Sequence, residues 1–132
     1  MLKSKKGLIC REHGCSSCCE ENSMPLTVRD IRKIIKNGYK SADFIVISRG
    51  ERHLRNYEGA CVFLEGGQCN IYSFRPEGCR LYPLLYDPSN DSIVIDPACP
   101  HQGEFKINQT SAEKLRKLVK TVKREKRREL IY

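Results

Sequence analysis

The residues of this chain whose types and spacing could do chemistry are its eight cysteines. Four fall within ten positions near the amino terminus and the other four are spread through the middle: Cys10, Cys15, Cys18 and Cys19, then Cys61, Cys69, Cys79 and Cys99. Cysteine thiolates are the soft ligands that zinc and iron–sulfur clusters take. Because the second group is dispersed, any site that the two groups share must be assembled by folding.

Disulfides are the first alternative, since an even number of cysteines in a small chain is also typical of secreted proteins. The opening residues, MLKSKKGLIC, carry lysines but lack the apolar run of about 7–15 residues that a secretory signal needs. No segment approaches the ~20 apolar residues of a membrane span. We therefore expect a cytoplasmic protein, in which clustered cysteines bind metal more often than they form disulfides. Redox-active thiols are the remaining alternative.

The spacing of the first cluster bears on the kind of metal. Structural zinc sites are commonly built from two close pairs, and only Cys15 and Cys18 have the C-x2-C spacing of such a pair. Cys10-x4-Cys15-x2-Cys18 matches the loop of plant-type [2Fe–2S] ferredoxins, although the strand pattern around it does not support a ferredoxin fold. Cys99-Pro100 is similar to the Cys-Pro that ends bacterial cluster-binding runs. Spacing alone therefore leaves iron–sulfur and zinc both open.

Several segments of the chain form a recognisable series: Cys15-Ser16-Ser17-Cys18-Cys19, then MPLTVRDI at 24–31, CVFL at 61–64, CNIY at 69–72, RPEGCR at 75–80, Tyr82-Pro83 and Cys99-Pro100. In this order they resemble the CxxCxxCC family, the "putative zinc- or iron-chelating domain", whose members are often labelled iron–sulfur-cluster oxidoreductases. The resemblance spans about residues 10–100, and it departs from the family pattern in having four residues rather than two in the first gap.

The resemblance implies cysteine-bound iron, in the form of an iron–sulfur cluster of the [4Fe–4S] kind, with zinc as the alternative cofactor. All eight cysteines are then candidate ligands, and a redox partner protein is expected. The resemblance implies no particular reaction, so an oxidoreductase and an accessory of methyl transfer both stay open. Flagellin lysine methylases belong to the wider family, but this chain has no glycine-rich stretch that could be assigned to S-adenosylmethionine.

Other side chains could support such a centre. Arg75 and Arg80 flank Cys79 and could donate hydrogen bonds to cluster sulfurs, or could instead pair with Glu77 or a backbone carbonyl. Three histidines and three tyrosines carry weaker signals, and we expect solvated histidines and tyrosines in hairpin cores: His13, His53 and His101, then Tyr72, Tyr82 and Tyr86.

The charge of the chain, +8 overall, is concentrated at its carboxyl end. Residues 111–132 hold nine Lys or Arg and three Glu, whereas residues 1–110 hold fifteen Lys or Arg and thirteen Asp or Glu. We expect a basic amphipathic helix over 110–131 that packs through Leu115, Leu118, Val119 and Val122. The alternative is that its basic residues, within 114–128, contact nucleic acid or an acidic partner: Lys120, Lys123, Arg124, Lys126, Arg127 and Arg128. Membrane-surface binding is disfavoured because the last turns are not bulky and apolar.

Helix-capping residues and turn residues predict the helices and strands that must position the cysteines. Thr27 and Asp30 predict a capping box for a helix over 28–37 that Gly38 ends. A shorter helix over 41–47 follows, with a strand as its alternative, and 51–59 carries no assignment. Gly66-Gly67 predicts a hairpin of 61–64 with 69–72 that has a cysteine on each arm.

Beyond this hairpin, a helical turn from Ser73 and Pro76 should lead to Cys79. A second hairpin of 81–86 with 92–95 should follow, and Thr110 with Glu113 forms a capping box for the last helix. The sequence thus predicts a single domain over 1–132 of α+β class, a small cysteine-rich metal-binding domain with short β-hairpins and a long C-terminal helix. Residues 10–100 are its metal-binding body. We expect it to serve electron transfer or a redox-linked reaction, or else to be a structural zinc module.

Overall fold

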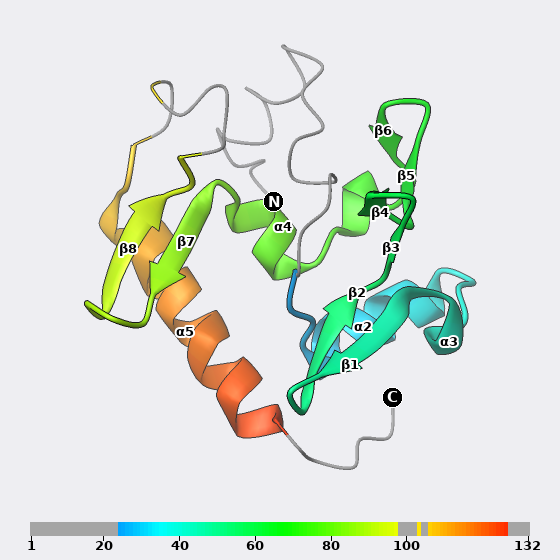
Figure 1. The fold of residues 1–132 in the computed structure, drawn as a ribbon, viewed down its shortest axis with the longest axis horizontal. Coiled ribbons are helices and arrows are strands. Elements are labelled where there is room, and N and C mark those ends of the chain that lie inside the picture. Colours follow the sequence, from blue (N-terminus) through cyan, green and yellow to red (C-terminus); the bar gives the residue numbers. More distant parts are fainter. Residues whose placement is uncertain (1–23, 98–102, 104–105, 127–132) are drawn as a thin grey trace.

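The computed structural model describes residues 24–97, 103 and 106–126, and this part of the chain is a mixed α+β structure, as predicted (Figure 1). Its strands form two-stranded antiparallel pairs, and a helix closes its carboxyl end. No helix within these residues is long and apolar enough to cross a membrane.

Helix α2 (Val28–Lys36) begins at the predicted capping box. The hydroxyl of Thr27 accepts a hydrogen bond from the Asp30 N–H at 3.1 Å, and the Asp30 carboxylate accepts one from the Thr27 N–H at 3.1 Å. The helix ends one residue earlier than predicted, with Gly38 at a φ of +100° behind it. Ile31 and Ile34 are fully buried, so the helix docks through one apolar face.

The predicted helix over 41–47 is only one turn long. Helix α3 (Ser41–Phe44) gives way to strand β1 (Ile45–Ser48), so the strand alternative is correct for the β-branched part. Strand β2 (Glu51–Leu54) pairs with β1 and lies in the segment that carried no assignment. The turn between the strands has positive φ at both central residues, 55° at Arg49 and 78° at Gly50.

The predicted hairpin of 61–64 with 69–72 is confirmed only next to its turn, and Cys61 belongs to a different strand pair. Strand β3 (Asn56–Tyr57) pairs with β4 (Ala60–Cys61), which places Cys61 opposite Asn56. Strand β5 (Leu64–Glu65) pairs with β6 (Gln68–Cys69) around the predicted Gly66-Gly67 turn, which places Cys69 opposite Leu64. The two tight turns follow each other closely and leave strands of only two residues. Cys61 and Cys69 therefore belong to separate strand pairs.

The second half of the chain follows the prediction more closely. After the 3-10 turn η2 (Tyr72–Phe74), helix α4 (Glu77–Leu81) starts behind Pro76 and carries Cys79. Strands β7 (Leu84–Asp87) and β8 (Ser92–Ile95) form the predicted hairpin, which begins at Leu84 rather than at 81 because α4 and the following turn use residues 81–83.

The C-terminal helix α5 (Gln109–Glu125) is capped by Asn108, whose side chain accepts a hydrogen bond from the Ser111 N–H at 2.8 Å. The predicted Thr110 cap is therefore wrong by two residues. The helix ends at Glu125, since Lys126 has extended backbone angles. Residues 127–131 of the predicted helix lie outside the described residues.

Two hydrophobic clusters form the core, and α4 contributes to both. The larger cluster gathers around α2 and includes Cys79, whereas Leu81 joins the smaller cluster formed with Leu84, Leu115 and Leu118. Figure 1 shows α4 between the half that contains α2 and the half that contains β7, β8 and α5. A displacement of α4 would therefore disturb the whole described structure.

Candidate metal centre

Three predicted ligands lie in the described residues, and all three contribute to the larger hydrophobic cluster. They come from separate elements: Cys61 from β4, Cys69 from β6 and Cys79 from α4. Cys61 and Cys79 are buried, with 6% and 8% of their surface exposed, and Cys69 is half-buried. The other predicted ligands lie outside the described residues: Cys10, Cys15, Cys18, Cys19 and Cys99.

The described cysteines do not complete a site by themselves. Within residues 24–97, 103 and 106–126, no three His, Cys, Asp or Glu side chains are grouped closely enough to hold a metal ion. A centre that uses any of these cysteines together with two or more further His, Cys, Asp or Glu ligands would therefore have to draw on residues outside the described ranges, where the other five cysteines, His13 and His101 lie.

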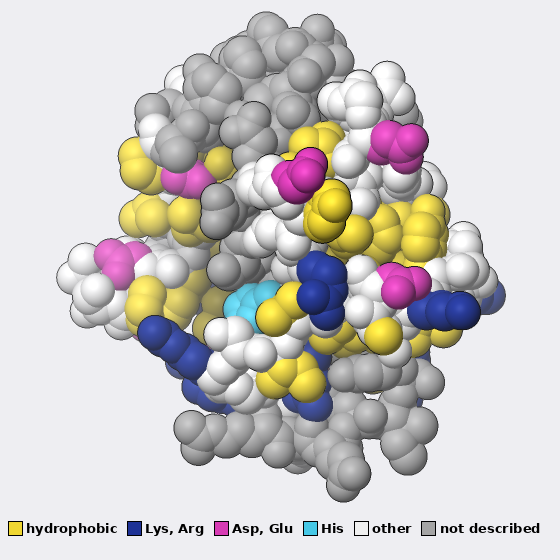
Figure 2. All heavy atoms as spheres, turned by 45° about the vertical axis from the view of Figure 1, so that its right-hand side comes forward, with side chains coloured by type: hydrophobic (Ala, Val, Ile, Leu, Met, Phe, Trp, Pro, Cys, Tyr) yellow, Lys and Arg dark blue, Asp and Glu magenta, His cyan; other side chains and the backbone are white. Residues whose placement is uncertain are grey.

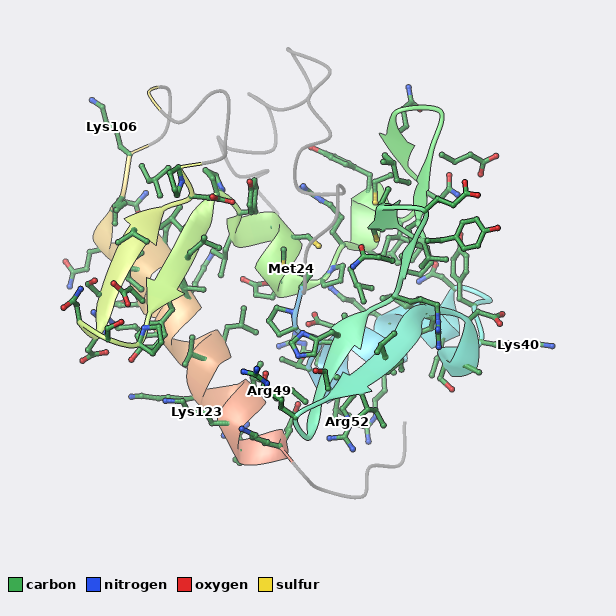
Figure 3. All side chains as sticks on the ribbon, viewed as in Figure 1. Met24, Lys40, Arg49, Arg52, Lys106 and Lys123 are labelled. Atoms are coloured by element: carbon green, nitrogen blue, oxygen red, sulfur yellow. The ribbon has the colours of Figure 1, made fainter. Side chains whose placement is uncertain are left out.

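The position of Cys79 depends on the two residues before it in α4. The Glu77 N–H, at the start of the helix, donates to the Asp30 carboxylate at 3.2 Å, so one carboxylate serves the amino ends of both α2 and α4. Gly78 faces Met24 so closely that an added Cβ would lie 2.5 Å from the methionine sulfur, and Figure 3 shows Met24 beside this helix. The capping box could be predicted from the sequence, but its link to α4 could not.

Asp30 is almost fully buried, with 3% of its surface exposed. Burial raises the pKa of Asp30 above the ordinary carboxyl value, because an ion loses hydration there, and the hydrogen bonds from Thr27 and Glu77 oppose this rise only in part.

A second anchor follows α4. The Tyr82 hydroxyl donates a hydrogen bond to the Asp96 carboxylate at 2.7 Å, and the Asp96 N–H donates to the Pro83 carbonyl at 2.7 Å. These bonds tie the segment just after Cys79 to the segment that leads to Cys99. Tyr82, predicted to lie in a hairpin core, is half-buried and joins two segments instead.

The two arginines next to Cys79 differ in what they contact. Arg75 donates from Nε to the Tyr72 carbonyl at 3.1 Å, and its guanidinium lies 4.0 Å from the centre of the Tyr72 ring. Arg75 thus donates to a backbone carbonyl, which was the predicted alternative to a hydrogen bond with a cluster sulfur. Arg80 lies half-buried in α4. For both, a hydrogen bond to cluster sulfur stays a prediction.

The basic helix packs on the body along its length. Leu115 and Leu118 are buried, and the Arg116 guanidinium contacts the Asp91 carboxylate at 2.7 Å. At the other end, the Glu125 carboxylate accepts a hydrogen bond from the Val28 N–H at 2.9 Å, and its backbone carbonyl accepts one from Arg52 at 2.9 Å. The amino end of α2 thus meets the carboxyl end of α5, each supplied with the charge that its dipole favours.

The only histidine in the described residues is His53, which lies half-buried in β2 rather than in a solvated loop. Its Nε2 is 3.4 Å from a Glu51 carboxylate oxygen. His13 and His101 lie outside the described residues.

Comparison with curated proteins and with solved structures found no significant match. A family model does match, over residues 9–114, which include every one of the eight cysteines. Because this match covers most of the chain and has the order that the sequence motifs indicated, the chain belongs to the CxxCxxCC family, described as a "putative zinc- or iron-chelating domain".

Proposed function

We propose that this protein carries a cysteine-ligated iron–sulfur cluster that serves electron transfer or a redox-linked reaction. The observation that supports this most is that Cys61, Cys69 and Cys79 reach one apolar cluster from three separate elements. Soft thiolates select iron–sulfur clusters or zinc, and an apolar surround with limited solvent access is what tunes a redox centre. Such a cluster, when bound, would accept and release single electrons.

Chain geometry lets the other cysteines join this set. Cys99 follows Asp96 by three residues, so it can be at most about 11 Å from Asp96. Cys19 precedes Met24 by five residues and can be at most about 18 Å from it. Met24 packs on Gly78, and Asp96 is hydrogen-bonded to Tyr82 and Pro83 just after α4, so both segments start close enough to α4 to supply thiolates near Cys79. Arg80, next to Cys79 on the same helix, would then donate a hydrogen bond to a sulfur.

The test is the metal content of anaerobically purified protein. We expect a brown protein with a broad absorption band near ~400 nm and with iron and acid-labile sulfide in equal amounts. Cys61→Ser and Cys79→Ser should lose most of this iron. Ala60→Ser is the matched control, because it adds a hydroxyl to the same strand as Cys61 without removing a thiol. A colourless protein with stoichiometric zinc would refute the cluster, and so would cysteine variants that keep the iron of the control.

The second candidate is a structural zinc module whose basic helix contacts nucleic acid or an acidic partner. What favours it is a group of exposed cations at helical spacing on α5, away from the buried leucines: Lys114, Lys117, Lys120 and Arg124. In contrast, Arg116, Lys123 and Lys126 have partners on the body, respectively Asp91, the Tyr86 ring and Glu51. The exposed group thus concentrates positive charge that the fold itself does not use.

Salt dependence tests this second candidate. A helix that neutralises phosphates should lose affinity for RNA or DNA steeply as salt rises, because each counterion that binding releases then gains less entropy. Replacing Lys117, Lys120 and Arg124 by glutamine should reduce the log–log salt slope by about 2–3. The control replaces three exposed cations elsewhere by glutamine: Arg29, Lys36 and Lys40. Equal loss in both triple variants, or no affinity at all, would leave α5 as a packing helix alone.

A further inference from the structure

A cavity of about 610 Å³ lies between the β1–β2 hairpin and the residue that follows α5. The hairpin contributes apolar wall from Val46 and Leu54, and Lys126 contributes from the end of α5. This volume is within the range of sites that hold small molecules, roughly 300–1,000 Å³. None of the residues that line the cavity is a cysteine, so it is separate from the metal ligands among the described residues.

The ionisable side chains of this cavity are mainly basic, and two uncharged polar residues, Ser48 and Asn56, also line it. Arg49, His53 and Lys126 line it together with one acid, Glu51. The two carboxylate oxygens of Glu51 are 3.4 Å from His53 Nε2 and 3.9 Å from Lys126 Nζ. Glu51 therefore orients two of the nitrogen donors, while two permanently charged cations against one carboxylate leave the cavity positive.

Arg49 differs from the other two donors in having no hydrogen-bond or ion-pair partner among the described residues. Among the described residues, no carboxylate or carbonyl lies within hydrogen-bond or ion-pair distance of its guanidinium. Figure 3 shows Arg49 beside the last turns of α5, and the same region of the surface in Figure 2 has a histidine among basic and apolar side chains. The Arg49 guanidinium, with its five N–H donors, thus lines a concave surface on which no described acceptor lies within hydrogen-bond distance of it.

The backbone of Arg49 gives an independent reason to regard the residue as functional. With φ of 55° at Arg49 and 78° at Gly50, the hairpin turn has the geometry in which Asn-Gly is favoured. Arginine adopts this left-handed conformation less readily than asparagine or glycine. Strain of this kind tends to be kept where the side chain has a role, and here the side chain lines the cavity.

We propose that this cavity binds the phosphate group of a small phosphorylated molecule. The Arg49 fork and the Lys126 ammonium contact the phosphate oxygens, since a dianion with three terminal oxygens matches a bidentate donor and a point charge better than a carboxylate does. Val46 and Leu54 contact the apolar part of the ligand. Glu51 keeps Lys126 directed at the site.

Isothermal titration of the full-length, metal-replete protein with phenyl phosphate tests this assignment, with inorganic phosphate and benzoate as comparisons. Phenyl phosphate should bind tightest, since only this probe offers both a phosphate and an apolar ring. Arg49→Asn suits the turn better than the native residue and removes the charge, so it should fold normally and weaken binding at least about tenfold. Lys126→Gln should also weaken it.

The control is Lys40→Asn, which removes one positive charge from an exposed position at the start of α3. This variant should bind phenyl phosphate like the wild type. The proposal is overturned if no probe gives measurable heat at millimolar concentration, if Arg49→Asn binds as tightly as wild type, or if Lys40→Asn loses as much affinity. Benzoate binding as tightly as phenyl phosphate would overturn the assignment to phosphate.

Discussion

Replacing Asp30 should reveal how strongly one buried carboxylate holds the two helices together. Its oxygens accept hydrogen bonds from the Thr27 N–H at 3.1 Å and from the Glu77 N–H at 3.2 Å. In Asp30→Ala both donors lose their acceptor, and each such loss costs about 1–3 kcal/mol. Relief of the unfavourable burial of the carboxylate offsets part of this cost. We therefore expect a net destabilisation of about 2–3 kcal/mol.

Urea unfolding followed by circular dichroism measures this effect. For a slope of about 1–3 kcal/mol per molar urea, the midpoint should fall by roughly 1 M or more, with the slope itself unchanged. Asp30→Asn keeps one acceptor oxygen and should lose about half as much. Asp43→Ala is the control, because Asp43 is an exposed acid in the first turn of α3. Since α4 carries Cys79, the metal content per chain should fall with stability in the Asp30 variants alone. The reasoning is refuted if Asp30→Ala and Asp43→Ala unfold at the same urea concentration.

Three further outcomes are expected. Burial raises the pKa of Asp30 in the folded state, so the stabilisation that the protonated carboxyl gives is fully present below the unfolded-state pKa and is lost as pH rises through the folded-state pKa. The difference in free energy of unfolding between wild type and Asp30→Asn, measured by urea titration, should therefore become smaller as pH rises. A difference that grows with pH contradicts this. Glu125→Ala should cost about 1–2 kcal/mol by removing the acceptor of the Val28 N–H, while Glu113→Ala, on the exposed side of α5, should cost less than half as much in the same denaturation assay. Metal removal should unfold much of the body over 10–100, because a thiolate site is rarely preformed; an unchanged circular dichroism spectrum in verified metal-free protein would argue against this.

The features that could be predicted from the sequence are those that depend on residues close together in the chain. The Thr27 and Asp30 caps, the Gly38 stop and the Gly66-Gly67 turn each depend on residues within a few positions, and the structure confirms all of them. The β1–β2 hairpin was missed because its turn has arginine where asparagine is typical. The predicted hairpin of 61–64 with 69–72 was too long, because a second tight turn precedes it and pairs Cys61 with Asn56 instead.

The contacts that place the candidate site depend on residues far apart in the chain, which local patterns do not report. The Asp30 bond to Glu77 spans 47 positions, and the Glu125 bond to Val28 spans 97. Neither pair has a signature in the sequence, since the two residues of each pair are far apart and Asp30 is already accounted for by its local capping role. For the cysteines, the sequence predicted the ligand type, and the fold added that Cys61, Cys69 and Cys79 share one apolar cluster.

The meeting of α2 and α5 has a consequence for how the protein matures in the cell. The hydrogen bonds from the Val28 N–H and the Arg52 guanidinium to Glu125 can form only once residue 125 has been synthesised, 97 and 73 positions after their donors. Contacts of such long sequence separation form slowly, because a large loop must close first. All eight cysteines precede residue 125, so their segments are synthesised before the contacts between α2 and α5 can form. We therefore expect that metal can reach the cysteine-bearing segments of the nascent chain before α5 docks on the body.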